Sequence, residues 1–166
     1  MYGIRGTMNK IVLGNENASI CLIQAVDEHD ASFLTSEYEK ITELSGRTDI
    51  LLVALQVSNW NHDLSPWKAP AVFGKEDFGD GAEKTLSYIE EELLPDIHKK
   101  YDRGTEGIPC IIGGYSLHNL LRDSGINSIL EWNPGNHFRD ADLRMAKAFA
   151  WCIRQPCNTG IVPDSP

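Results

Sequence analysis

The residues best suited to chemistry are a serine, Ser116, and a histidine, His137. Ser116 follows an apolar run that ends in two glycines, and this pattern is typical of a nucleophile elbow. In such an elbow, strained backbone raises the serine hydroxyl above the edge of a sheet. His137 lies in a predicted turn between a strand and a helix, where its imidazole can take the serine proton as a general base. Together they predict attack of a serine on an acyl carbon.

Plainer interpretations of the same residues stay open. The two glycines also suit an ordinary glycine-rich turn, and a lone loop histidine is more often a simple surface residue. An elbow needs small residues two positions before and after the serine; Gly114 meets the first demand and His118 fails the second. The order of serine before histidine favours the elbow, because enzymes built on this motif carry the two in that order.

A long irregular segment, residues 58–81, follows the clearest buried strand and carries Trp60 and Trp67. Loops of this length in a compact domain are usually functional or disordered, and the aromatic content favours a folded, pocket-lining loop. It can aim a backbone N–H at a developing oxyanion, with the N–H of Leu117 as the other donor. The plainer alternative is that both tryptophans pack beneath the loop. His62 and Asp63 lack a third ligand at suitable spacing, so we predict no metal site.

The elements that must position these groups alternate along the chain. Apolar runs predict strands over 20–26, 49–57, 108–112 and 128–132, and helical periodicity predicts helices over 33–44, 82–103, 117–124 and 140–153. The helix over 82–103 should present Leu86, Ile89, Leu93, Leu94 and Ile97 on one face and kink at Pro95. Alternation of this kind predicts an α/β fold, a mostly parallel sheet with helices on both faces in a three-layer sandwich.

Ligands of such sheets bind beyond the carboxyl ends of the strands. The predicted ends bring Asp27, the Trp60 loop, Ser116 and His137 to one edge of the sheet. We therefore expect the chemistry to lie there.

Length and charge narrow the class of protein. With 166 residues we expect one domain over 1–153 and a loose tail over 154–166. The net charge of −9 speaks against nucleic acid and against an anionic membrane surface as partners. The longest apolar run, residues 50–55, is far shorter than a membrane-spanning helix, and the first residues contain no apolar signal core. We therefore expect a cytoplasmic protein.

The cysteines fit the same expectation. Cys21 and Cys110 lie in apolar strand-like runs and are expected to be buried thiols rather than disulfide partners. Cys152 and Cys157 lack a matching Cys or His cluster, so nothing points to zinc. No organic cofactor is predicted either. An uncovered sheet edge would favour a homo-oligomer.

Four segments together resemble the esterase branch of the α/β-hydrolases, which includes relatives of enterochelin esterase and esterase D. They are 59–70 (Asn-Trp-Asn-His-Asp-Leu-Ser-Pro-Trp-Lys-Ala-Pro), 88–97 (Tyr-Ile-Glu-Glu-Glu-Leu-Leu-Pro-Asp-Ile), 113–117 (Gly-Gly-Tyr-Ser-Leu) and 132–138 (Trp-Asn-Pro-Gly-Asn-His-Phe).

The resemblance implies a shortened α/β-hydrolase fold and a serine hydrolase that cleaves carboxylic or thioester bonds of a small molecule. Ser116 matches the nucleophile and His137 the base. Leu117 and Trp60 match the oxyanion positions. Contact with the substrate is expected from Asn61, Trp67 and Tyr115.

One departure from that family is large. Only 20 residues separate Ser116 from His137, too few for the strands and the acid-bearing loop that the family carries there. Two hypotheses of different classes follow: an esterase-type hydrolase that lacks its third triad member, or a non-catalytic remnant that keeps the scaffold as a small-molecule binding module. A truncated gene is a third explanation of the short spacing.

Overall fold

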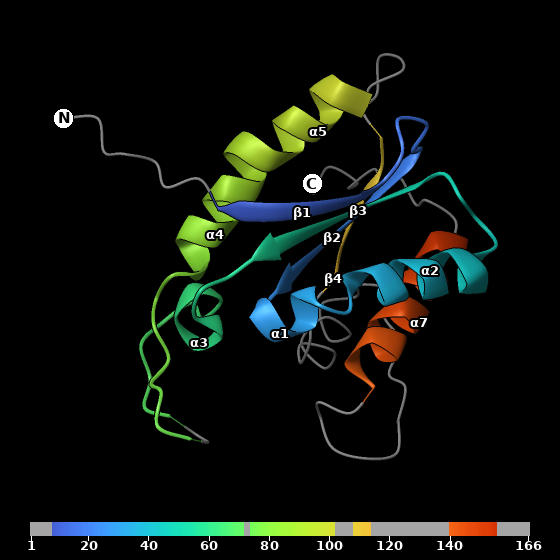
Figure 1. Cartoon of the computed structure of the whole chain (residues 1–166). Helices are drawn as coiled ribbons and strands as arrows, with labels where there is room; N and C mark the ends of the chain where they lie inside the picture. Colours follow the sequence, from blue (N-terminus) through green and yellow to red (C-terminus); the bar gives the residue numbers. More distant parts are fainter. Residues whose placement is uncertain (1–7, 72–73, 102–107, 114–139, 156–166) are drawn as a thin grey trace, which may run out of the picture.

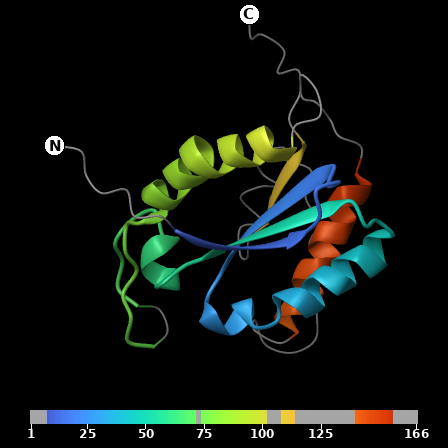
Figure 2. The same cartoon turned by 45° about the horizontal axis from the view of Figure 1, so that its top comes forward.

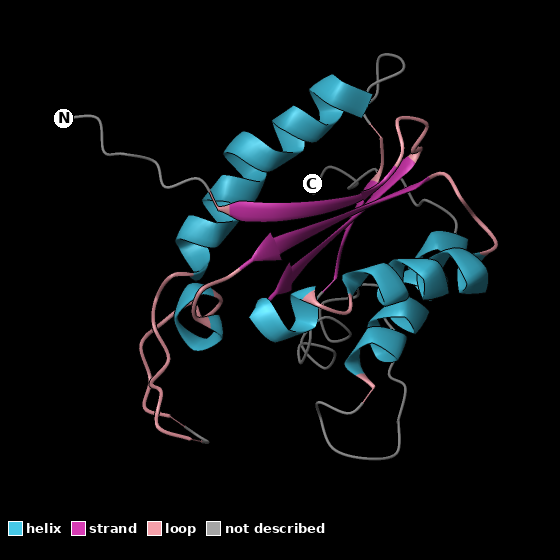
Figure 3. Cartoon of the chain, viewed as in Figure 1, coloured by secondary structure: helices cyan, strands magenta, loops and turns pink. Residues whose placement is uncertain are grey.

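A sheet with helices on both faces forms the centre of the molecule, and it has four strands in the part of the chain that the structure describes (Figure 1). The computed structural model describes residues 8–71, 74–101, 108–113 and 140–155. Across the sheet the strands lie in the order β1 (Asn9–Gly14), β3 (Ile50–Gln56), β2 (Ile20–Val26) and β4 (Cys110–Gly113). The predicted α/β class is therefore confirmed. Figure 3 shows the strands between the helices of the two faces.

The two central strands are the most reliably predicted elements. β2 and β3 are nearly continuous runs of aliphatic residues, and almost every one of their residues is buried. They pair in parallel from Ile20 opposite Ile50 to Val26 opposite Gln56. A strand covered on both faces needs apolar side chains at odd and even positions alike, which is why these runs show no alternation.

β1 was not predicted, and it makes the sheet mixed. It pairs with β3 in antiparallel register, from Asn9 opposite Gln56 to Gly14 opposite Leu51. The two pairings of β2 are parallel, so the predicted mostly parallel sheet is confirmed only in part. The short β1 carries only three large apolar residues and lies at the sheet edge, with Val12 exposed. Its pattern is too weak to predict from sequence.

Gly14 ends β1 with a φ of +122°, a conformation that favours glycine. A Cβ at this position would stand 2.3 Å from the carbonyl oxygen of Ile50. The chain can therefore turn closely over β3 at this point before it continues into β2, on the far side of β3.

Among the described residues, a continuous helical segment covers one face of the sheet (Figure 2). It consists of α4 (Ala82–Tyr88), a π-helical turn η1 (Ile89–Leu93) and α5 (Leu94–Tyr101). The segment matches the predicted helix, and it passes Pro95 by means of the π turn. The Leu94 N–H bonds the carbonyl of Ile89, five residues back, so the wide turn precedes the proline, whose ring would clash in a regular helix.

The π turn also changes which residues face the sheet. Ile89, Leu93 and Ile97 are buried as predicted, and Leu94 packs against the same core. Leu86, predicted on the same face, is 54% exposed, and Tyr88 is buried instead. The prediction was wrong at Leu86 because the extra residue of the π turn rotates α4 relative to α5.

The other face is covered by α2 (Leu34–Ser45) and α7 (Ala141–Arg154), both within one helical turn of their predicted bounds. Gly46 ends α2 in the left-handed conformation, as the sequence predicted. The short helix α1 (Glu28–Ala31) links β2 to α2. The predicted strand over 128–132, the predicted helix over 117–124 and most of the predicted tail lie outside the described residues. Within the described part of the chain, no helix is long and apolar enough to cross a membrane.

Candidate functional site

The carboxyl ends of β2, β3 and β4 lie at one edge of the sheet, as the sequence predicted for the candidate site. Their parallel registers place Val26 beside Gln56, and Gln24 beside Gly113. The chain leaves β2 into Asp27 and leaves β3 into the loop that carries Trp60. Of the predicted site residues, Tyr115, Ser116, Leu117 and His137 lie outside the described residues. Gly113, three positions before the serine, is at this edge.

An open cavity of about 900 Å³ lies at the same edge. Its lining combines the start of β1, the turn from β2 into α1 and the end of β3, and it is predominantly polar: Asn9, Asp27, Glu28, His29, Ser32, Gln56, Val57 and Ser58. Asn9 reaches the edge because β1 runs antiparallel to β3, so its contribution depends on the strand that the sequence did not reveal.

Asp27 is held in place as the N-cap of α1. Its Oδ1 accepts a hydrogen bond of 2.7 Å from the N–H of Asp30. His29 packs edge-on against Phe33, with 5.2 Å between ring centroids. The hydroxyl of Ser32 donates to the His29 carbonyl at 2.6 Å. This side of the cavity is thus a compact turn fixed by local hydrogen bonds.

The loop after β3 is organised by one carboxylate. The Oδ2 of Asp63 accepts hydrogen bonds of 3.1 Å from the backbone N–H groups of Ser58 and Asn59. Its Oδ1 lies 3.0 Å from Nδ1 of His62. Burial raises the pKa of Asp63, but the hydrogen bonds from Asn59, His62 and Ser58 outweigh it and hold the pKa below its ordinary value. The ionised Asp63 therefore fixes how the chain leaves β3.

The short helix α3 (Trp60–Asp63) begins at the predicted oxyanion residue. Asn59 caps it, with its Oδ1 accepting from the His62 N–H at 2.8 Å. Trp60 is the first helical residue, a position whose N–H has no partner within the helix. An N–H of this kind is available to an anionic oxygen outside the helix.

The remaining predicted contact residues of the loop lie farther along it. Asn61 donates from its side chain to the Glu76 carbonyl at 3.2 Å, across the loop. The loop is folded, as predicted, and Ala69 and Phe78 form an antiparallel bridge within it. Trp67 is 69% exposed, so it does not pack beneath the loop. The tryptophan and Asn61 do not line the cavity described above.

Gly113, at the end of β4, lies in close contact with a helix. A Cβ there would stand 2.7 Å from Cζ and 2.9 Å from Cε1 of Phe149 on α7. The Phe149 ring, 1% exposed, therefore packs directly on the end of β4. Only glycine permits this contact without displacement of the ring. Gly113 thus serves helix–strand packing at the end of β4.

A buried polar pair beside Gly113 escaped the sequence analysis. Gln24 on β2 donates from Nε2 to Oε1 of Glu37 on α2 at 2.7 Å, and both residues are buried. Burial raises the pKa of the Glu37 carboxyl to about 7, although the hydrogen bond from Gln24 opposes it. The one signal was a glutamine inside an otherwise apolar strand, which requires a buried partner.

The start of α7 is fixed near the same end of the sheet. Asp142, in its first turn, pairs with Nζ of Lys40 on α2. Burial, with added repulsion from Asp27 and Asp142, raises the pKa of Asp30. Asp142 is therefore close enough to the α1 turn to act on it. Asp140, three positions after His137, is the N-cap residue of this helix.

Within the described residues, no group of three or more His, Cys, Asp or Glu side chains is arranged to hold a metal ion. A comparison with known proteins found no family model, no curated protein and no solved structure that matches the chain.

Proposed function

We propose that this chain is a serine hydrolase of the esterase type, built on a shortened α/β-hydrolase fold with three layers. Its substrate is a small carboxylic or thioester, and it acts in the cytoplasm without a cofactor. Ser116 is the nucleophile and His137 the general base. The proposal rests on the resemblance of the four segments to esterases and on one structural observation, which concerns where the chain leaves and rejoins the described fold.

That observation is the position of Gly113 and Asp140. β4 ends at the carboxyl edge, three residues before Ser116. Asp140, the N-cap residue of α7, comes three residues after His137, and the first turn of α7 lies near the α1 turn at that edge. Three residues of extended chain span about 10 Å. The proposal therefore places the serine and the histidine close to the edge at which ligands of parallel sheets bind.

In the proposed reaction, His137 takes the proton of the Ser116 hydroxyl as its oxygen attacks the acyl carbon. The backbone N–H groups of Leu117 and Trp60 stabilise the negative charge on the carbonyl oxygen. Asn61, Trp67 and Tyr115 contact the substrate. Water then releases the acyl group from the serine, with His137 as the base again.

The short spacing between Ser116 and His137 makes the expected activity low. A triad acid fixes the tautomer of the histidine and stabilises the imidazolium, and disabling it in a serine protease costs about 10⁴ in rate. We therefore expect measurable but slow ester hydrolysis.

The alternative function is a small-molecule binding module. It is favoured by the open, largely polar cavity of about 900 Å³ at the carboxyl edge of the sheet. A scaffold that lost its catalytic acid could retain such a cavity.

Hydrolysis of p-nitrophenyl acetate by the purified protein separates these functions. The matched variants are Ser116→Ala and, as control, Ser87→Ala on α4, a serine that belongs neither to the cavity lining nor to the proposed catalytic residues. We expect Ser116→Ala to lose all hydrolysis above the buffer rate and Ser87→Ala to keep it. Equal rates for the wild type and Ser116→Ala would reject the hydrolase and leave the binding module.

A further inference from the structure

Two cysteines lie side by side at the opposite end of β4 from the candidate site. Cys21 on β2 is the register partner of Cys110, the first residue of β4. The backbone N–H of Cys21 donates to the carbonyl of Pro109 at 2.8 Å, which fixes the two strands at this point. Both thiols are free, as expected from the sequence, but their pairing was not predicted.

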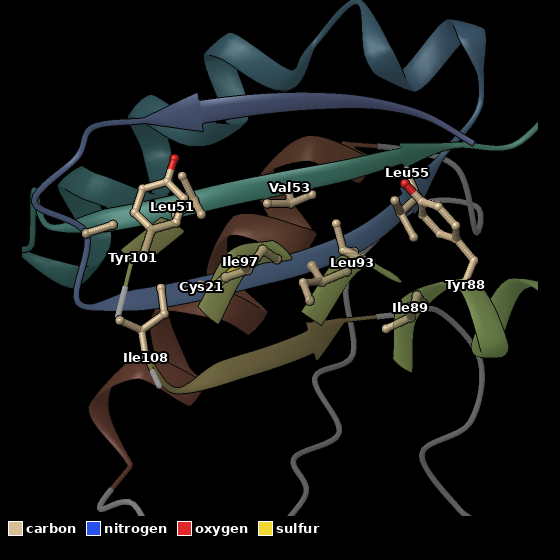
Figure 4. Packing of buried hydrophobic residues seen from close by; sticks show 12 residues of the cluster. Cys21, Leu51, Val53, Leu55, Tyr88, Ile89, Leu93, Ile97, Tyr101 and Ile108 are labelled. Carbon is tan, nitrogen blue, oxygen red and sulfur yellow. The ribbon is translucent and has the colours of Figure 1, made fainter. Parts of the chain in front are cut away.

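Both side chains point to the same face of the sheet. Cys21 belongs to the buried core beneath α4 and α5 (Figure 4). Cys110 packs against that core. Neighbouring strands lie about 4.7–4.9 Å apart. This spacing falls within the Cα separations of about 4.4–6.8 Å that disulfides span. The backbone therefore needs little movement for a bond between the two sulfurs.

The two thiols differ in access and in surroundings. Cys21 is fully buried, whereas Cys110 is only partly buried. His98 on α5 places its Nε2 4.0 Å from Sγ of Cys110. A solvent-borne reagent can therefore reach Cys110 next to an imidazole, while Cys21 lies behind it.

Electrostatics agree with this geometry. The hydrogen bond from Cys21 lowers the pKa of Cys110 most; burial opposes it, His98 lowers it further, and the result is a pKa of about 6. The pKa of Cys21 is raised by the same hydrogen bond and by burial. Cys110 is thus the thiolate and Cys21 the protonated partner at neutral pH.

We propose that Cys110 is a thiol oxidation site for hydroperoxides and that Cys21 resolves the product into a disulfide between β2 and β4. The site lies at the amino end of β4 and uses none of the residues of the proposed hydrolase. It stands or falls independently of that function.

The chemistry balances with a hydroperoxide as the oxidant. The Cys110 thiolate attacks the terminal oxygen, the O–O bond breaks, and the sulfur becomes a sulfenic acid while an alkoxide or hydroxide leaves and takes a proton from water. The Cys21 thiol then attacks the sulfenic sulfur. An S–S bond forms, the S–O bond breaks, and the Cys21 proton and the sulfenic hydroxyl leave as water.

Peptide mapping can test this on the wild-type protein. Each of the four cysteines falls in a different tryptic peptide, namely 11–40, 104–122, 148–154 and 155–166. After treatment with one equivalent of hydrogen peroxide, we expect a linked pair of peptides 11–40 and 104–122 that dithiothreitol separates. Oxidation that leaves these two unlinked, or that links either of them to another cysteine peptide, would overturn the proposal.

Variants assign the two roles. Cys110→Ser should abolish the linked pair, whereas Cys21→Ala should leave a sulfenic acid on Cys110 that dimedone traps. Cys152 is a partly buried cysteine on α7. Its substitution, Cys152→Ser, is the matched control and should leave the linkage unchanged. A dimedone adduct on Cys152 in place of Cys110 would contradict the assignment.

A rate measurement avoids the risk that a core variant fails to fold. Burial raises the pKa of Cys152, so iodoacetamide should modify Cys110 at pH 7 at least about ten times faster than Cys152 in the wild type. His98→Gln, a change on the exposed side of α5, should slow Cys110 about threefold or more. Equal rates at the two cysteines would refute the activated thiolate.

Discussion

The two faces of the sheet are covered in different ways. One face is covered by a continuous segment, α4 to α5, which buries Ile89, Leu93 and Ile97. The other is covered by α2 and α7, which are far apart in the sequence and carry polar contacts between them. Asp142 at the start of α7 pairs with Lys40, and Arg154 at its end donates to the Leu44 carbonyl at 3.3 Å.

This difference shows which interactions position the helices on each face. The continuous segment α4 to α5 can pack on the sheet through an apolar stripe alone. The π turn inserts an extra residue and so sets which side chains of that stripe face the sheet. α7 is far from β4 in the sequence, and ion pairing and hydrogen bonding at its two ends supplement the packing of Phe149. These polar contacts also fix the position of α7, which follows His137 in the sequence.

The largest effect should come from removal of the buried ring on the α7 face. Phe149→Ala should lower the free energy of unfolding by about 3–5 kcal/mol, because it deletes a fully buried aromatic side chain. Leu93→Ala on the other face should cost about 2–5 kcal/mol. Urea unfolding measures both. The control Trp67→Ala, on an exposed side chain, should change stability by less than about 0.5 kcal/mol. If Phe149→Ala lowered the free energy of unfolding by less than about 1 kcal/mol, the Phe149 ring would not be packed in the core.

The next largest effect should be a pH dependence of stability that arises on the α7 face. The pKa of Glu37 rises from an ordinary 4.5 to about 7 in the folded state. The native state therefore binds more protons than the unfolded state between these values. Stability should be highest below about pH 4.5 for this group and should fall, by up to about 3 kcal/mol, as the pH rises through 7.

Glu37→Gln provides the control for that effect. It keeps the hydrogen-bonding shape toward Gln24 but does not titrate, so its stability should change less between pH 5 and pH 8 than that of the wild type. Identical pH profiles of unfolding would show that Glu37 is not buried in this way.

The smallest of these changes is Gly113→Ala, which adds one methyl group against the Phe149 ring. It should cost about 1–3 kcal/mol through overpacking. Phe149→Leu should couple favourably with it in a double-mutant cycle, because the smaller side chain leaves room for the methyl group. Additive effects of the two substitutions would place them out of contact.

Much of this fold was predictable because several elements have strong local sequence patterns. Ile20–Val26 and the strand around Val53 read as buried strands from their aliphatic runs alone, and Gly46 marked a helix end. β1 could not be predicted, because an edge strand of six residues with one face exposed carries too weak a pattern. The exposure of Leu86 depended on a π turn that periodicity does not reveal.

The candidate site was predicted unevenly for a similar reason. The rule for parallel strands placed Asp27 and the Trp60 loop at one edge, and the structure confirms that placement. The sequence did not predict that Asn9 lines the cavity or that Gln24 pairs with Glu37, because both contacts depend on which elements become neighbours in the fold. The same is true of Cys21 and Cys110, which are far apart in the chain and become partners only through the pairing of β2 with β4.

Covalent labelling of Ser116 tests the central proposal most directly. The protein is treated with a fluorophosphonate, which reacts with serines activated by a nearby base, and tryptic peptide 104–122 is then analysed by mass spectrometry. We predict one adduct on Ser116 that is lost in His137→Ala and after heat denaturation. Absence of the adduct in the native protein, or equal labelling with and without His137, would contradict a serine nucleophile at this site.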